Sequence, residues 1–129
     1  MSRNGYLAQL IFYGFVGLIG TVFHYTILLV SVEIFSVSVV VSSGVGFLVG
    51  ATINHELNRR FVFKETELPY AKTAGRFFAV AGFGLILNIV TIYFLVSAIG
   101  IHYFAAQILA TAFVFLTSFV ANKAWTFLY

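Results

Sequence analysis

The amino-acid sequence predicts an all-α, polytopic membrane protein of four transmembrane helices arranged as two repeated hairpins, and three observations support this. The 129 residues are 61% hydrophobic and only 9% charged, whereas an ordinary soluble domain is roughly 25% charged. Long stretches of the chain carry no formal charge, and its two halves resemble each other. So few polar side chains cannot cover a soluble domain, and so much apolar surface excludes a disordered chain.

The four helices follow from three gaps in formal charge. The gaps run between Arg3 and Glu33, between Glu33 and Glu56, and from Phe77 to Asn122. A helix needs about 20 apolar residues to cross a hydrocarbon core about 30 Å thick, so the first two gaps hold one span each and the third holds two. We therefore expect helices near residues 8–32, 37–56, 75–97 and 103–122. Strands are the competing prediction, but the alternating segments of a closed membrane barrel are missing.

One turn separates the helices within each pair. Gly100 is the natural helix terminator in the stretch 97–102, because glycine readily ends a helix in the left-handed conformation. In the first half the turn is expected at 33–38, since the charge of Glu33 is hard to bury in lipid. The apolar run after Arg3 is much longer than that of a signal peptide, so an uncleaved first helix is expected.

The basic residues determine the expected orientation. With four spans, all of them lie on one side of the membrane: before the first helix, between the second and third, or after the fourth. They are Arg3, Arg59, Arg60, Lys64, Lys72, Arg76 and Lys123. By the positive-inside rule, both termini and the central loop are cytoplasmic.

A repeat with an offset of 64 residues relates the two halves, and the segments 58–63 and 122–127 correspond best. We expect a single transmembrane domain over residues 1–129, with repeat halves 8–63 and 72–127 joined by a cytoplasmic basic loop at 57–74. Each half contains an even number of spans, so both enter the membrane in the same direction and form a parallel repeat.

Small residues recur on the expected packing faces. They are Gly14, Gly17 and Gly20 in the first helix, Gly46 and Gly50 in the second, and Ala79, Gly82 and Gly84 in the third. Such residues let helices approach closely in lipid, and the GxxxG pattern of the second helix is typical of such contacts. We interpret them as contacts within the bundle. Four helices enclose little space, so a path for a sizeable substrate requires a homo-oligomer, with a dimer favoured.

The first candidate site is the repeated closing segment. In it Asn58 or Asn122 is followed by basic and aromatic residues. The guanidinium groups of Arg59 and Arg60 can bind phosphate oxygens bidentately, and Lys123 adds a point charge. The aromatic residues are expected at interfacial depth, where they anchor the segment or contact an acyl or isoprenoid chain. They are Phe61, Phe63, Trp125 and Phe127. The alternative is a plain membrane anchor, which does not need asparagine at a fixed place.

The second candidate is the pair His24 and Asn88, which the repeat aligns near the middle of their helices. Polar side chains at that depth usually face the bundle or a wet cavity, so we expect the two to face one another or to line one cavity. The alternative is an interhelical hydrogen bond that fixes packing.

The third candidate is Asn54-His55-Glu56, at the cytoplasmic end of the second helix. Glu56 either pairs with Arg59 or Arg60 along the helix, holds the arginines apart until a phosphate arrives, or couples to protons. The segment lacks the second histidine of a zincin, and the chain has no cysteine, catalytic triad or phosphate loop. We therefore expect no metal, no cofactor, no enzymatic activity and no nucleic-acid partner.

These motifs resemble the GtrA-like family of small four-helix membrane proteins over roughly residues 10–128. The resemblance rests on Phe12–Gly17, on the closing segments 58–63 and 122–127, and on Arg76-Phe77-Phe78. Two departures stand out: His24 replaces a residue that is commonly acidic in the family, and Ala81 stands where glycine is frequent.

The resemblance implies a flippase that moves a polyprenyl-phosphate-linked monosaccharide to the outer leaflet for cell-surface polysaccharide synthesis. It implies a bacterial or archaeal inner membrane and a glycosyltransferase partner that makes the sugar lipid. Arg59, Arg60, Arg76 and Lys123 would meet the phosphate, Asn58 and Asn122 would orient sugar or phosphate, and His24, Asn88 and Asn54 would line a polar path. The alternatives are a small proton-coupled multidrug-type exporter that uses Glu56, and a non-transporting scaffold for a glycosyltransferase.

Overall fold

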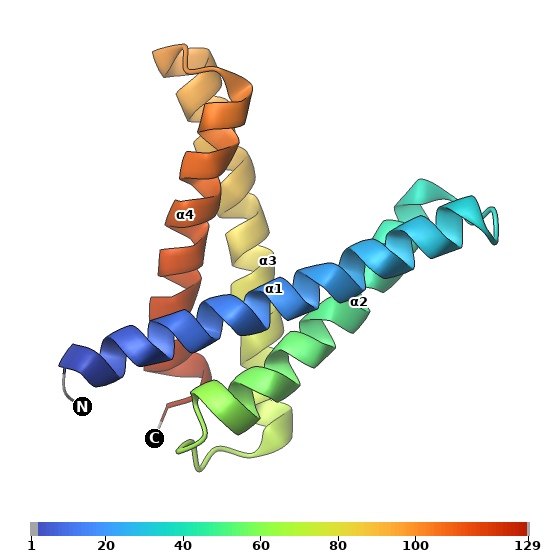
Figure 1. Cartoon of the computed structure of the whole chain (residues 1–129). Helices are drawn as coiled ribbons and strands as arrows, with labels where there is room; N and C mark the ends of the chain where they lie inside the picture. The colour runs from blue at the N-terminus through green and yellow to red at the C-terminus, as the bar shows by residue number, and fades with distance from the viewer. Residues whose placement is uncertain (1–2, 129) are drawn as a thin grey trace. The chain divides into compact units, whose positions relative to one another are not determined.

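The computed structural model describes residues 3–128, without the side chains of residues 3, 4, 39, 40, 103 and 104. The described chain is helical and contains no strand between residues 3 and 128. It divides into two compact units, Met1–Thr66 and Glu67–Tyr129, and each unit is an antiparallel helical hairpin (Figure 1). The fold class predicted from the sequence is therefore confirmed as all-α.

The first hairpin consists of α1 (Arg3–Glu33), α2 (Val39–Leu57) and the short π-helical turn η1 (Asn58–Val62). The turn between α1 and α2 falls where it was predicted, after Glu33. Ser38 then starts α2, because its side-chain oxygen accepts a hydrogen bond from the Val41 backbone N–H at 3.3 Å. This cap satisfies one of the donors that every helix start leaves open.

The second hairpin consists of α3 (Tyr70–Tyr93) with η2 (Phe94–Ile99), and α4 (Tyr103–Ala121) with η3 (Asn122–Thr126). Gly100 has a φ of 82° and ends η2 in the left-handed conformation, as predicted. Both the Gly100 and the Ile101 N–H groups bond to the Leu95 carbonyl oxygen, which closes the end of the helix.

The segment that connects the hairpins is shorter than the predicted loop 57–74. η1 prolongs the helix to Val62, and α3 begins at Tyr70. An ion pair between Glu56 and Arg60, one helical turn apart, supports the continuation. Pro69, which lacks an N–H group and favours helix starts, immediately precedes α3.

The outer surface of both hairpins is apolar. Three described helical segments are long and apolar enough to cross a membrane, with mean hydropathies of 2.0, 2.2 and 1.6. They are Gly5–Glu33, Tyr70–Ile99 and Ala105–Thr126, and α2 is a fourth helix. Large apolar side chains such as Leu18 and Leu85 are more than half exposed. Exposing so much apolar surface to water is unfavourable, whereas lipid solvates it, so the protein is an integral membrane protein.

Glycines let α1 and α2 approach closely. A Cβ atom at Gly46 would lie 2.7 Å from the His24 carbonyl oxygen, and one at Gly50 would lie 2.7 Å from the Gly20 carbonyl oxygen. The GxxxG pattern is therefore a contact within the first hairpin, as interpreted from the sequence. The interpretation is wrong for Gly17 and Gly82, which are not close-packing positions. A Cβ atom at either position would meet no described atom within 4 Å.

The same 64-residue offset that relates the sequences also relates the buried positions. Every described buried residue of the second unit lies 64 positions after a buried residue of the first. The pairs are Gln9 and Thr73, Tyr13 and Phe77, Val16 and Val80, Gly20 and Gly84, Ser42 and Ala106, Gly46 and Ala110, His55 and Phe119, Asn58 and Asn122, Val62 and Thr126, and Phe63 and Phe127. Each hairpin thus buries the same face.

One aromatic pair packs at the closing end of each hairpin, which is the end that carries η1 or η3. The rings of Tyr13 and Phe63 have centroids 6.1 Å apart, and those of Phe77 and Phe127 lie 6.2 Å apart. Phe63 and Phe127 are 1% and 0% exposed, so they pack inside the hairpins rather than against an acyl or isoprenoid chain, while their interfacial depth stays a prediction. The reason is the π-helical turn before each of them, which directs the side chain back onto the facing helix. Phe61 and Trp125 are exposed.

Candidate functional site

The basic groups of each hairpin gather at its closing end. Arg59 and Arg60 lie in η1, Lys123 lies in η3, and Arg76 lies in the part of α3 that contacts η3. The turns at the opposite ends, residues 34–38 and 100–102, contain no lysine or arginine. The side chain of Arg3 lies outside the described residues. Each hairpin therefore has a cationic end and an end without basic residues.

In the first hairpin the cations are partly neutralised. Arg60 Nε donates to Glu56 Oε1, so the pairing predicted for Glu56 forms with Arg60. The Arg60 side chain is 69% exposed and that of Glu56 is 33% exposed, so the pair can exchange partners at little cost. Arg59 is half-buried beside them. A phosphate arriving here would compete with Glu56 for Arg60.

In the second hairpin, Arg76 is held by Trp125. Its Nη1 atom donates to the Trp125 carbonyl oxygen at 2.7 Å, and its guanidinium carbon lies 5.0 Å from the centroid of the Trp125 ring. This stacking is a cation–π contact that fixes the side chain on η3. A guanidinium carries five N–H donors, so others remain to bind a phosphate oxygen.

Asn58 and Asn122 occupy the interior of the hairpins. They are 0% and 2% exposed, and their carbonyl oxygens accept the N–H groups of Phe63 and Phe127 at 2.7 and 2.9 Å. Asn58 Nδ2 also donates to Asn54 O at 2.8 Å and to Asn54 Oδ1 at 3.1 Å. The π-helical turns that carry the basic residues thus close on the backbone carbonyls of the two asparagines, and neither side chain reaches the surface.

His24 packs against the glycines of α2. Its Cδ2 atom would lie 2.7 Å from a Cβ atom at Gly46, and its ring centroid lies 6.3 Å from that of Phe47. The buried Nε2 atom has no hydrogen-bond partner among the described residues. Asn88 belongs to the other unit, so the prediction that the two residues face one another stays a prediction.

Asn88 belongs to a polar cluster that sequence reasoning missed. Gln107 Nε2 donates to Asn88 Oδ1 at 3.2 Å and to Thr111 Oγ1 at 2.9 Å, which joins α3 to α4. A second missed residue is Gln9, whose Nε2 atom donates to the Val62 carbonyl oxygen at 3.1 Å and joins α1 to η1. The available signal was an amide side chain inside a strongly apolar run.

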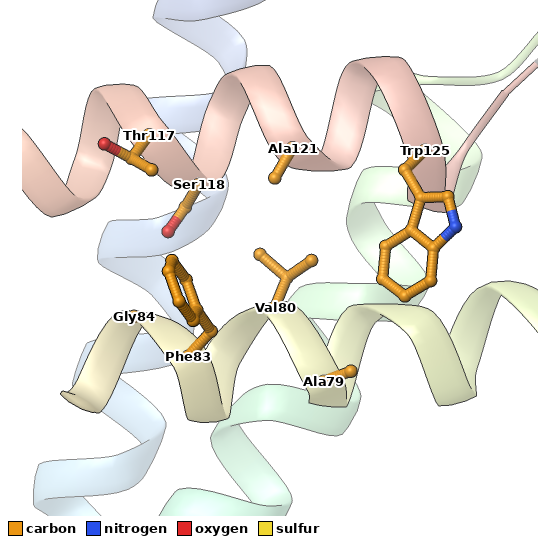
Figure 2. Close-up of a pocket in the computed structure, with 8 residues that line it drawn as sticks. All are labelled: Ala79, Val80, Phe83, Gly84, Thr117, Ser118, Ala121 and Trp125. Carbon is orange, nitrogen blue, oxygen red and sulfur yellow. The ribbon is translucent and has the colours of Figure 1, made fainter. Parts of the chain in front are cut away.

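An apolar groove runs between α3 and α4 (Figure 2). It has a volume of about 230 Å³ and is lined by Ala79, Val80, Phe83, Gly84, Thr117, Ser118, Ala121 and Trp125. Trp125 closes the end nearest η3, whereas Gly84, Thr117 and Ser118 line the other end (Figure 2). The groove therefore begins at the residue on which Arg76 stacks.

No described group of three or more histidine, aspartate or glutamate side chains could hold a metal ion. Two apolar helical hairpins with cationic closing turns define an integral membrane protein whose arginine and lysine side chains gather at one end of each hairpin. Residues 12–127 match the family described as GtrA/DPMS, transmembrane domain, and the chain belongs to this family. The resemblance drawn from the motifs is thus confirmed, and it supports a membrane-associated function related to sugar lipids. Among curated proteins, no relative matches the chain.

Proposed function

We propose that the protein flips a polyprenyl-phosphate-linked monosaccharide from the cytoplasmic to the outer leaflet, without catalysing a reaction on it. Membership of a family of sugar-lipid membrane domains supports this, and such domains are typically translocases or scaffolds. The observation that carries the proposal is the gathering of arginine and lysine at the closing end of both apolar hairpins. A phosphate joined to a long apolar chain complements such a surface.

In the proposed arrangement all four helices cross the membrane as two hairpins. Both termini and the connecting segment are cytoplasmic, because the basic residues of each hairpin lie at its closing end. The membrane is the inner membrane of a bacterium or archaeon. A glycosyltransferase supplies the sugar lipid on the cytoplasmic side, and a dimer provides the space that one chain lacks.

The residues divide into three proposed roles. Arg59, Arg60, Arg76 and Lys123 bind the phosphate at the cytoplasmic surface. Asn58 and Asn122 position these cations by holding the turns, rather than by touching the substrate. His24, Asn54 and Asn88, with Gln107, offer polar groups to the sugar within the membrane.

Deletion of the protein in its native cells tests this proposal against a scaffold function. We expect the sugar lipid to accumulate in the cytoplasmic leaflet while the glycosyltransferase stays at the membrane with unchanged abundance. The two measurements are the leaflet distribution of the sugar lipid and the location of the transferase. A displaced transferase with normal export of the sugar lipid would instead identify a scaffold.

A further inference from the structure

The two hairpins differ in how they fill corresponding positions. At four of the eight positions 64 residues before the residues that line the groove, the first hairpin carries larger side chains, whereas Ile19 and Phe61 are smaller than Phe83 and Trp125. The replacements are Phe15 for Ala79, Ile53 for Thr117, Asn54 for Ser118 and Leu57 for Ala121. Ile53, Asn54 and Leu57 are only partly exposed, so they take up space between the helices that the smaller Thr117, Ser118 and Ala121 leave open, whereas Phe15 is exposed. The described groove thus lies where the second half carries these smaller side chains.

The two hairpins also differ in charge, because the helices of the second carry no acidic residue. The position that corresponds to Glu56 is Val120, and residues 68–129 contain no aspartate or glutamate. Arg76, which stacks on the groove residue Trp125, stands where the first hairpin has Phe12. The second hairpin thus combines an apolar groove with a cation at its end, whereas the first combines larger side chains at several corresponding positions with an ion pair.

We propose that the groove between α3 and α4 binds the single aliphatic chain of a phosphate lipid, with its phosphate held by Arg76. The apolar lining of the groove complements an aliphatic chain, and the positive charge of Arg76 complements a phosphate. A phosphate lipid carries both groups in one molecule. Trp125 lies where chain and phosphate would join, as an aromatic residue at a membrane interface does. This inference rests on the proposed function for the choice of a polyprenyl lipid.

Trp125 provides the measurement, because it is the only tryptophan of the chain. Purified protein in detergent is titrated with farnesyl phosphate, with farnesol and with inorganic phosphate, and tryptophan fluorescence is followed. We expect a saturable change with farnesyl phosphate and none with inorganic phosphate. Arg76→Gln is expected to weaken farnesyl phosphate about tenfold, the usual effect of losing a charged hydrogen bond, and to leave farnesol unaffected. Native mass spectrometry gives the affinities independently of the fluorescence.

Filling the groove tests its position. Ser118→Asn with Ala121→Leu introduces the side chains of the first hairpin and is expected to abolish binding of farnesyl phosphate. Ala124→Leu is the matched control, because Ala124 is exposed in η3 and does not line the groove. Circular dichroism establishes whether each variant is folded. If the double variant does not fold, Ala79→Phe is used instead, because it fills the same groove from α3.

Three results would overturn the proposal. They are equal binding by wild type and a folded groove-filled variant, a full response to inorganic phosphate alone, and a change of oligomeric mass on filling the groove. The last would show that protein covers the groove. Failure of the proposed function is distinguishable from failure of the groove proposal. Binding of farnesyl phosphate without flipping of sugar lipid would contradict the proposed function but not the groove proposal. Flipping of sugar lipid without binding in the groove would contradict the groove proposal but not the proposed function.

Discussion

Replacing Arg59 and Arg60 together by glutamine is expected to slow translocation of the sugar lipid at least about tenfold, the usual effect of losing charged hydrogen bonds to a phosphate. The loss has two physical causes. The phosphate loses two guanidinium partners as it leaves the headgroup layer, where partial desolvation strengthens each contact. In addition, Glu56 loses its ion pair with Arg60 and then repels the phosphate. The rate at which sugar lipid appears on the outer leaflet of reconstituted vesicles measures the effect.

Lys64→Gln with Lys72→Gln is the matched control, because this variant loses the same charge from exposed positions outside η1 and η3. It is expected to flip at nearly the wild-type rate. If the arginine variant, folded and inserted in the same orientation, flips as fast as this control, the first hairpin has no part in phosphate binding. Farnesyl phosphate binding in the second hairpin is expected to persist in both variants.

Phe63→Ala is expected to lower the free energy of unfolding by about 3 kcal/mol or more, the usual cost of removing a fully buried phenylalanine. Phe63 is 1% exposed and packs edge-on against Tyr13. Removing its ring leaves a cavity where α1 meets the end of η1. Phe127→Ala is expected to cost a similar amount, because Phe127 is fully buried and packs against Phe77 with a ring-centroid separation of 6.2 Å.

Phe61→Ala is the control for this prediction, with the same substitution two residues earlier. Phe61 is 64% exposed, so its loss leaves no internal cavity. Denaturant titration followed by circular dichroism in detergent separates the two variants. Equal destabilisation by Phe61→Ala and Phe63→Ala would contradict the burial difference on which the account of the closing turns depends.

The helices were predictable from the sequence because lipid imposes a simple rule on charge. The uncharged stretches between Arg3, Glu33 and Glu56 are each long enough for a transmembrane helix. Gly100 ends a helix because it adopts the left-handed conformation that other residues avoid. The side-chain directions at the closing turns were not predictable. An α-helical period places Phe61 and Phe63 on different faces but does not say which face is buried, and a π-helical turn changes the period at that point.

The candidate site was predictable in composition but not in arrangement. The repeat identified Asn58 and Asn122, yet sequence reasoning placed them toward the headgroup, whereas both are buried. Their side chains are short, and the amide of Asn58 donates to Asn54 within the hairpin. Gln107 was missed because its partner Asn88 lies on the facing helix, at a distance of 19 residues in the chain.

The central claim is translocation, and a leaflet-accessibility assay on the purified protein tests it most directly. The wild-type protein is reconstituted into vesicles with a small panel of polyprenyl-phosphate sugars, and the fraction of each lipid at the outer face is followed over time beside protein-free vesicles. We expect at least one sugar lipid to equilibrate between the leaflets much faster with the protein than without it. Equal rates in both kinds of vesicle for the whole panel, with correctly folded and inserted protein, would contradict it.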